Sequence, residues 1–191
     1  MQKLVFIAAL TLSLPVIAWA QETPRTEIFS GYSYLRLDDS GVPNQDRDLN
    51  GYIVSTNTTL YKFIGIKTEV SGHFGDFQTN VFPQTDQGQT LFLAGPVFTL
   101  RKFERIQPFA HALFGVDRLR LDNSALGLSQ TTYKFAFAAG GGVDLMTPLG
   151  NKLAVRLFQA DYLLTRFTGS NASNLRASTG IVVRLGHVDS K

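Results

Sequence analysis

Histidine, serine and charged side chains supply the residue types with which this chain could do chemistry. Ser71 and His73 lie two positions apart, so in an extended strand they share one face and could act as a nucleophile and its base. His111 is followed by Ala112 and Leu113 and has no hydroxyl neighbour. The histidines lack acidic partners at metal-binding spacing, and the absence of cysteine excludes thiol catalysis and thiolate sites. We therefore expect no metal and no cofactor.

The segment that holds Ser71 and His73 alternates in polarity between Gly65 and Phe74. The odd positions carry Lys67, Glu69, Ser71 and His73, whereas the even positions carry Ile66, Thr68, Val70 and Phe74. Because successive strand residues point to opposite faces, this pattern predicts a strand with one polar and one apolar side. Ser71 and His73 share this polar face with Lys67 and Glu69, which favours a structural role for the histidines over a catalytic one.

Similar segments recur along the chain and predict eight strands. They lie near 26–37, 49–60, 64–77, 90–100, 106–119, 132–146, 152–166 and 174–186. The connections alternate between long (38–48, 78–89, 120–131) and short (61–63, 101–105, 147–151), with an intermediate one at 168–173. Such alternation is typical of an up-and-down barrel whose two rims face different compartments. The fold class expected is all-β, an eight-stranded antiparallel barrel.

Two kinds of barrel fit alternating strands: a lipocalin-like soluble barrel with an apolar interior, and a membrane barrel with an apolar exterior. The polar face decides between them. In the segment 132–146 that face carries Lys134, Asp144 and mainly alanine and glycine between them. So few charges suit a crowded interior better than a surface in water, and the many aromatic residues near strand ends suit membrane interfaces. We therefore expect the apolar face to meet lipid.

The N-terminus predicts export. Lys3, the apolar run 4–17 and the sequence Ala18-Trp19-Ala20 form the three regions of a signal peptide, with cleavage after Ala20. The remaining residues, 21–191, fit one domain. Without Lys3 the chain has 17 basic and 15 acidic residues and no basic run, so nucleic acid binding is not expected.

Four segments carry a resemblance to a known family: Phe29-Ser30-Gly31-Tyr32-Ser33-Tyr34, Pro108 to Gly115, Gly140 to Asp144, and Gly180 to Leu185. With them, the chain resembles the small eight-stranded outer-membrane barrels of the OmpA-like superfamily over essentially all of residues 21–191. The resemblance implies a bacterial outer-membrane location. The last segment is similar to the terminal strand signal that barrel-assembly machinery reads, although six residues follow it here.

The polar parity of each strand predicts a set of ionisable residues inside the barrel. Positive and negative charges balance in this set, which favours a plug of paired side chains over a pore lined by one sign of charge. The predicted interior network consists of Lys67, Glu69, His73, His111, Asp117, Lys134, Asp144, Asp161, Arg176 and Arg184. Arg156 has the opposite parity to Asp161, which predicts either a rim position or a bulge between the two, and we favour the bulge.

The function expected is a structural or surface-interaction role without catalysis. Some related barrels act on lipid A with a serine and a histidine two residues apart, but Ser71 and His73 stand in the reverse order and on the polar face. The alternatives are a narrow porin-like passage for small solutes and a soluble lipocalin-like periplasmic binding barrel. Expected partners are outer-membrane lipids, lipopolysaccharide and the barrel-assembly machinery, and we expect a monomer.

Overall fold

A computed structural model describes residues 26–38, 47–61, 63–77, 85–101, 105–123, 128–147, 152–167 and 170–186. The predicted signal peptide and the six-residue tail, apart from Gly186, lie outside these residues. Within the described ranges no helix is long and apolar enough to cross a membrane.

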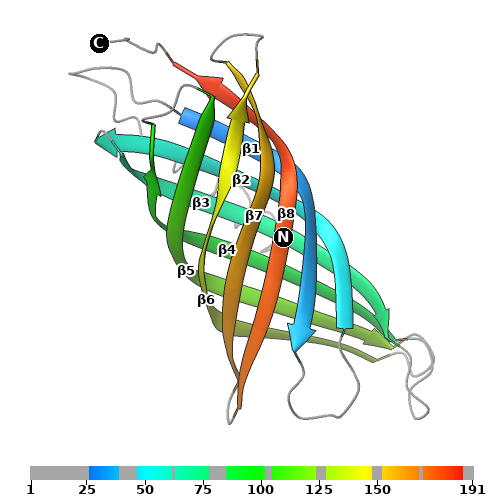
Figure 1. Cartoon of the computed structure of the whole chain (residues 1–191). Helices are drawn as coiled ribbons and strands as arrows, with labels where there is room; N and C mark the ends of the chain where they lie inside the picture. Colours follow the sequence, from blue (N-terminus) through cyan, green and yellow to red (C-terminus); the bar gives the residue numbers. More distant parts are fainter. Residues whose placement is uncertain are drawn as a thin grey trace, which may run out of the picture.

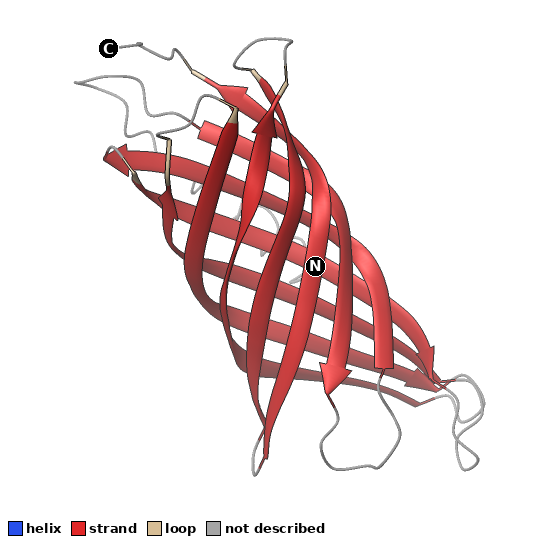
Figure 2. Ribbon diagram, in the orientation of Figure 1, coloured by secondary structure: helices blue, strands red, loops and turns tan. Residues whose placement is uncertain are grey.

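Eight strands, each antiparallel to the next, close into one barrel (Figure 1 and Figure 2). The barrel closes where β1 pairs with β8, from Thr26 opposite Leu185 to Asp38 opposite Ser173. The strands are β1 (Thr26–Asp38), β2 (Arg47–Tyr61), β3 (Ile64–Phe77), β4 (Thr85–Thr99), β5 (Ile106–Asn123), β6 (Leu128–Met146), β7 (Leu153–Phe167) and β8 (Ser170–Leu185). The predicted up-and-down barrel is confirmed. We call the end that holds Thr26 and Leu185 the inner end, and the opposite end the outer end.

Several strands run further toward the outer end than predicted. β5 continues to Asn123 and β6 begins at Leu128, so the connection between them, predicted to be long (120–131), comprises only 124–127. This connection is shorter than the one between Thr99 and Ile106 at the inner end, and the strict alternation of lengths is therefore wrong here. The polar residues at these strand ends resemble loop residues in sequence, but they continue the backbone hydrogen-bond ladder. Their polarity therefore does not mark the end of a strand.

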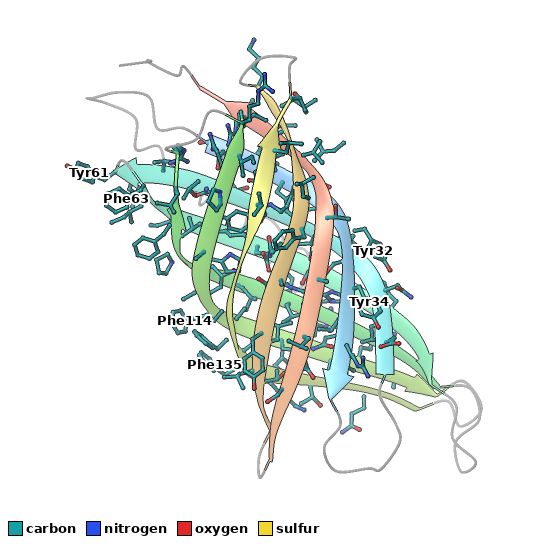
Figure 3. The ribbon with its side chains drawn as sticks, in the orientation of Figure 1. Tyr32, Tyr34, Tyr61, Phe63, Phe114 and Phe135 are labelled. Atoms are coloured by element: carbon teal, nitrogen blue, oxygen red, sulfur yellow. The ribbon has the colours of Figure 1, made fainter. Side chains whose placement is uncertain are left out.

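The two faces of the wall differ as the alternation predicts. In β3 the side chains of Lys67 and Glu69 are buried, whereas Ile66 and Val70 are exposed on the outside. Figure 3 shows labelled aromatic side chains projecting from the wall, with Tyr61 and Phe63 near the inner end and Phe114 and Phe135 farther toward the outer end. An apolar exterior around a polar interior is the arrangement of a membrane barrel, opposite to that of a lipocalin-like barrel.

A bulge in β7 changes which residues face inward. The register between β7 and β8 shifts between Arg156 and Gln159, so both of these side chains are buried while Leu157 and Phe158 are exposed. The hydroxyl of Thr179 donates to the Arg156 carbonyl at 2.9 Å. The predicted bulge is thus confirmed, and it places Arg156 inside the barrel.

Proline interrupts the backbone ladder at one place without a bulge. The pairing of β4 with β5 omits Gly95 and Pro96 but resumes at Val97 in the same register. Because proline has no N–H, it cannot donate to the neighbouring strand. The chain keeps its register across the gap, so Pro96 lies within β4 without a bulge.

Candidate functional site

The centre of the barrel interior is organised around Arg176, which is 1% exposed. Its Nη2 contacts Glu69 and lies 2.5 Å from Asp161 Oδ2, while its Nε donates to the same Asp161 oxygen at 2.9 Å. Lys67 Nζ lies 2.8 Å from the second oxygen of Glu69. Two positive and two negative side chains therefore meet in one buried cluster, where each charge has an opposite neighbour.

The two described histidines lie beside this cluster and do not form a dyad with Ser71. Ser71 Oγ accepts a hydrogen bond from Arg176 at 3.0 Å, whereas His73 Nε2 lies 2.9 Å from Ser33 Oγ. His111 Nε2 lies 2.9 Å from Asp161 Oδ1. The hydroxyl closest in sequence to His73 is thus engaged with Arg176, and His73 meets Ser33 of β1 instead of Ser71.

Arg156 links the centre to a second group of ions near the inner end. Its Nε and Nη2 donate to the two carboxylate oxygens of Asp144 at 2.8 and 3.0 Å, and its Nη1 donates to Gln159 at 2.7 Å. The guanidinium also lies between the rings of Phe29 and Phe109, 4.1 Å from each centroid. A planar guanidinium suits this combination of a bidentate carboxylate and two aromatic faces.

Glu27 and Arg184 complete the inner-end group. Their side chains lie 3.0 Å apart, and Arg184 also donates to Gln107 at 2.5 Å. Asn57 donates to the other oxygen of Glu27 at 2.9 Å. A cavity of about 10 Å³, lined by Glu27, Asn57 and Arg156 among others, leaves room for roughly one water molecule. The inner end is therefore closely filled.

Asp117 and Lys134 lie apart from both groups, nearer the outer end. They face each other in the register of β5 and β6, and Asp117 accepts a hydrogen bond from Gln89 at 2.7 Å. Asp117 is buried, whereas Lys134 is half-buried. The residues expected to form one network therefore divide among a central group, an inner-end group and an outer pair.

An apolar layer separates the outer pair from the central group. Along β5, Leu113 lies between His111 and Asp117, and along β7, Leu163 follows Asp161 toward the outer end. These side chains belong to one buried cluster formed by Leu35, Leu49, Leu91, Leu93, Leu113, Ala136, Ala138 and Leu163. Six of the eight strands contribute to this cluster, whereas β3 and β8 place polar side chains such as His73 and Asn174 inside the wall.

Solved structures share this architecture at low sequence identity. The chain is similar to Neisserial surface protein A, with a TM-score of 0.67 and 10% identity over 84% of this chain and 97% of that one. It is also similar to Ail, the attachment invasion locus protein of Yersinia pestis, with a TM-score of 0.56 and 18% identity over 85% and 99% of the two chains. For the outer membrane protein OprG of Pseudomonas aeruginosa the TM-score is 0.56, with 11% identity over 88% and 99%.

The chain has the fold of the small eight-stranded outer-membrane barrels. No protein-family model matches the sequence, and no curated protein matches it. The resemblance predicted from sequence is therefore confirmed for the fold.

Within this outer-membrane barrel fold, the sequence pattern missed some interior residues. Glu27 could have been found, because it shares the parity of Phe29 and Ser33 in the same strand. Gln159 donates to Asp161 at 2.7 Å and accepts from Lys67 at 3.2 Å. It lies two positions before Asp161, so the same parity rule could have found it. The described residues contain no group of three or more acidic, histidine or cysteine side chains that could hold a metal ion.

Proposed function

We propose that this protein is a bacterial outer-membrane barrel with a closed interior that acts through its outer surface and carries out no catalysis. One observation carries the proposal: a buried apolar cluster from six strands and a cluster of paired charges fill the interior next to each other. An apolar constriction stops ions because water leaves it. Paired charges also differ from an ion-conducting pore, which is more often lined by charges of one sign. The interior side chains then contribute to the stability of the barrel, and the outer surface carries the function.

The outer-membrane location is supported by the exposed apolar belt and by the similar solved structures. The exposed side chains of Ile181, Val183 and Leu185 in β8 support recognition of the last strand by the barrel-assembly machinery. Arg105 and Lys152 are exposed at the inner end, where they suit the anionic headgroups of the inner leaflet. Lipopolysaccharide and other outer-membrane lipids would surround the wall of a monomer.

Fractionation and gel migration test the location. The proposal predicts that the protein fractionates with the outer membrane and migrates faster on gels when it is not heated, because the closed barrel resists detergent. Recovery of a soluble monomer from the periplasm without detergent would instead support the lipocalin-like alternative and contradict the proposal.

Assays of lipid A test the absence of catalysis. Cells that express the protein, the His73→Ala variant or the His111→Ala variant are predicted to contain the same lipid A. A lipid A modification that appears with the unaltered protein and disappears with either substitution would show an enzyme and overturn this part of the proposal.

A further inference from the structure

A row of inward-facing positions runs across the strands from the central group to the outer pair, and we call it the polar row. Its neighbouring members are partners in register from β7 through β8, β1, β2 and β3 to β4: Gln159, Ser178, Ser33, Gly51, His73 and Gln89. All members except Gly51 are polar, and these are at most 4% exposed. Because the strands of a barrel are tilted against its axis, a row that crosses them also climbs along that axis.

The polar row passes the buried apolar cluster at His73. Leu35 and Leu49 lie two positions from the row toward the outer end, whereas Leu91 lies two positions from it toward the inner end. No described residue of β3, the strand between them that carries His73, belongs to the cluster. The row therefore moves from the inner side of the cluster to its outer side, where Gln89 binds Asp117.

Hydrogen bonds along the polar row determine which ring nitrogen of His73 carries the proton. Gly51 has no side chain, so the imidazole reaches past β2, and its Nε2 lies 2.9 Å from Ser33 Oγ. Ser33 Oγ already accepts a hydrogen bond from Ser178 Oγ at 3.2 Å, which leaves its own hydrogen for His73 Nε2. In a neutral imidazole the nitrogen that accepts is unprotonated, so the proton lies on Nδ1.

Polar atoms without a partner follow where the polar row continues to the outer pair. Among the described residues, His73 Nδ1, Gln89 Oε1 and Asp117 Oδ1 are buried and have no hydrogen-bond partner. The orientation of the Gln89 amide is settled, because its Nε2 donates to Asp117 Oδ2 at 2.7 Å and a carboxylate only accepts. One donor and two acceptors are left in the interior, where polar atoms nearly always have a partner.

We propose that a single water molecule binds between His73, Gln89 and Asp117. It accepts a hydrogen bond from His73 Nδ1–H and donates its two hydrogens to Gln89 Oε1 and Asp117 Oδ1. Buried water typically makes about three hydrogen bonds, and a bridging water connects neighbouring polar groups that do not bond directly. The bound water completes a hydrogen-bonded connection from Ser178, beside the central group, to the outer pair.

A sodium or potassium ion fits these atoms less well than water. A cation would need the lone pair of His73 Nδ1, which would move the ring proton to Nε2. Ser33 would then accept from both Ser178 and His73, and its own hydrogen would have no acceptor in the polar row. Lys134, which faces Asp117 in register, adds positive charge beside the site. A neutral molecule that both donates and accepts meets these conditions.

The test is nuclear magnetic resonance of the full-length barrel in lipid nanodiscs, with isotope-labelled histidine. Chemical shifts distinguish protonated from unprotonated ring nitrogens, and the His73 signals are assigned by their absence from the His73→Phe variant. Cross-relaxation from water to the ring N–H detects a bound water, because its sign differs for long-lived and short-lived contacts. Gln89→Leu removes one acceptor of the water, and Thr90→Val, the next residue of β4, is the control variant.

The unaltered protein is expected to show His73 protonated at Nδ1 and a bound-water signal at that proton. Gln89→Leu is expected to lose most of this signal, whereas Thr90→Val keeps it. A proton on Nε2, the absence of a bound-water signal, or an equal signal in Gln89→Leu would each overturn the inference.

Two further readings complete the test. His73 signals that change when potassium replaces sodium would show a bound cation and would also overturn the inference. The tautomer and the water signal of the unaltered protein need no substitution, so they decide the question even where Gln89→Leu fails to fold. Unheated gel migration reports the folding of each variant.

Discussion

Arg156 and Asp144 face each other across the seam between β6 and β7, with Nε and Nη2 of the arginine 2.8 and 3.0 Å from the two carboxylate oxygens. The bulge in β7 makes this pair possible, because it turns Arg156 inward at a position where regular alternation would place it in lipid. One inserted residue thus connects the inner-end ions to the central group through Gln159.

Removing one partner of this pair should destabilise the barrel strongly. Asp144→Ala leaves the Arg156 guanidinium buried without its carboxylate, which is expected to cost about 3–5 kcal/mol in the free energy of unfolding. The double variant Arg156→Met with Asp144→Leu should cost less than the sum of the two single changes. Urea unfolding in lipid vesicles measures both, with the exposed Asp48→Asn as a control. Additive costs would contradict the pairing.

Arg176 should be more important than any other interior cation, because it separates Glu69 from Asp161. Arg176→Met leaves both carboxylates in the interior with Lys67 as their nearest cation, and we expect a loss of about 3–5 kcal/mol. Lys152→Met is the control: this lysine is exposed at the inner end, and the loss should stay below about 1 kcal/mol. Equal losses for the two variants would show that the central group is not the main ion cluster.

Tyr52 covers Gly72 on the outer face, and the pair predicts a position-specific effect. A Cβ added at Gly72 would lie 2.8 Å from the Tyr52 ring, whereas one added at Gly88 would lie 3.9 Å from the Phe74 ring. Gly72→Ala should therefore destabilise the barrel by about 1–3 kcal/mol through overpacking. Gly88→Ala should be neutral or slightly stabilising, since it only restricts the unfolded chain. The same unfolding assay compares them, and a reversed order would refute the packing account.

Period-two alternation was sufficient to predict the barrel and the direction of most interior side chains. It worked for β3 because Lys67, Glu69 and His73 alternate with apolar residues without interruption. For Arg156 it left a rim position and a bulge as alternatives, and the break in parity between Arg156 and Asp161 was the signal that favoured the bulge. It also ended one strand at 119 and began the next at 132, whereas β5 continues to Asn123 and β6 begins at Leu128, because polar residues there belong to strands outside the membrane.

The division of the interior into layers could not be predicted from one strand at a time. Leu91 and Leu113 share the parity of charged residues, yet they belong to one buried apolar cluster. Which inward residues meet depends on the tilt and stagger of eight strands, and a strand pattern contains no information on that stagger. The apolar layer therefore became visible only in three dimensions.

Planar-bilayer conductance tests the closed interior most directly. The purified barrel is predicted to give no discrete current steps, while the double variant Leu91→Ala with Leu113→Ala, which thins the apolar layer, gives small ones. Phe114→Ala with Val116→Ala, two exposed residues on the outer face, is the control and should remain silent. Reproducible ohmic steps from the unaltered protein would contradict the closed interior and support the narrow passage instead.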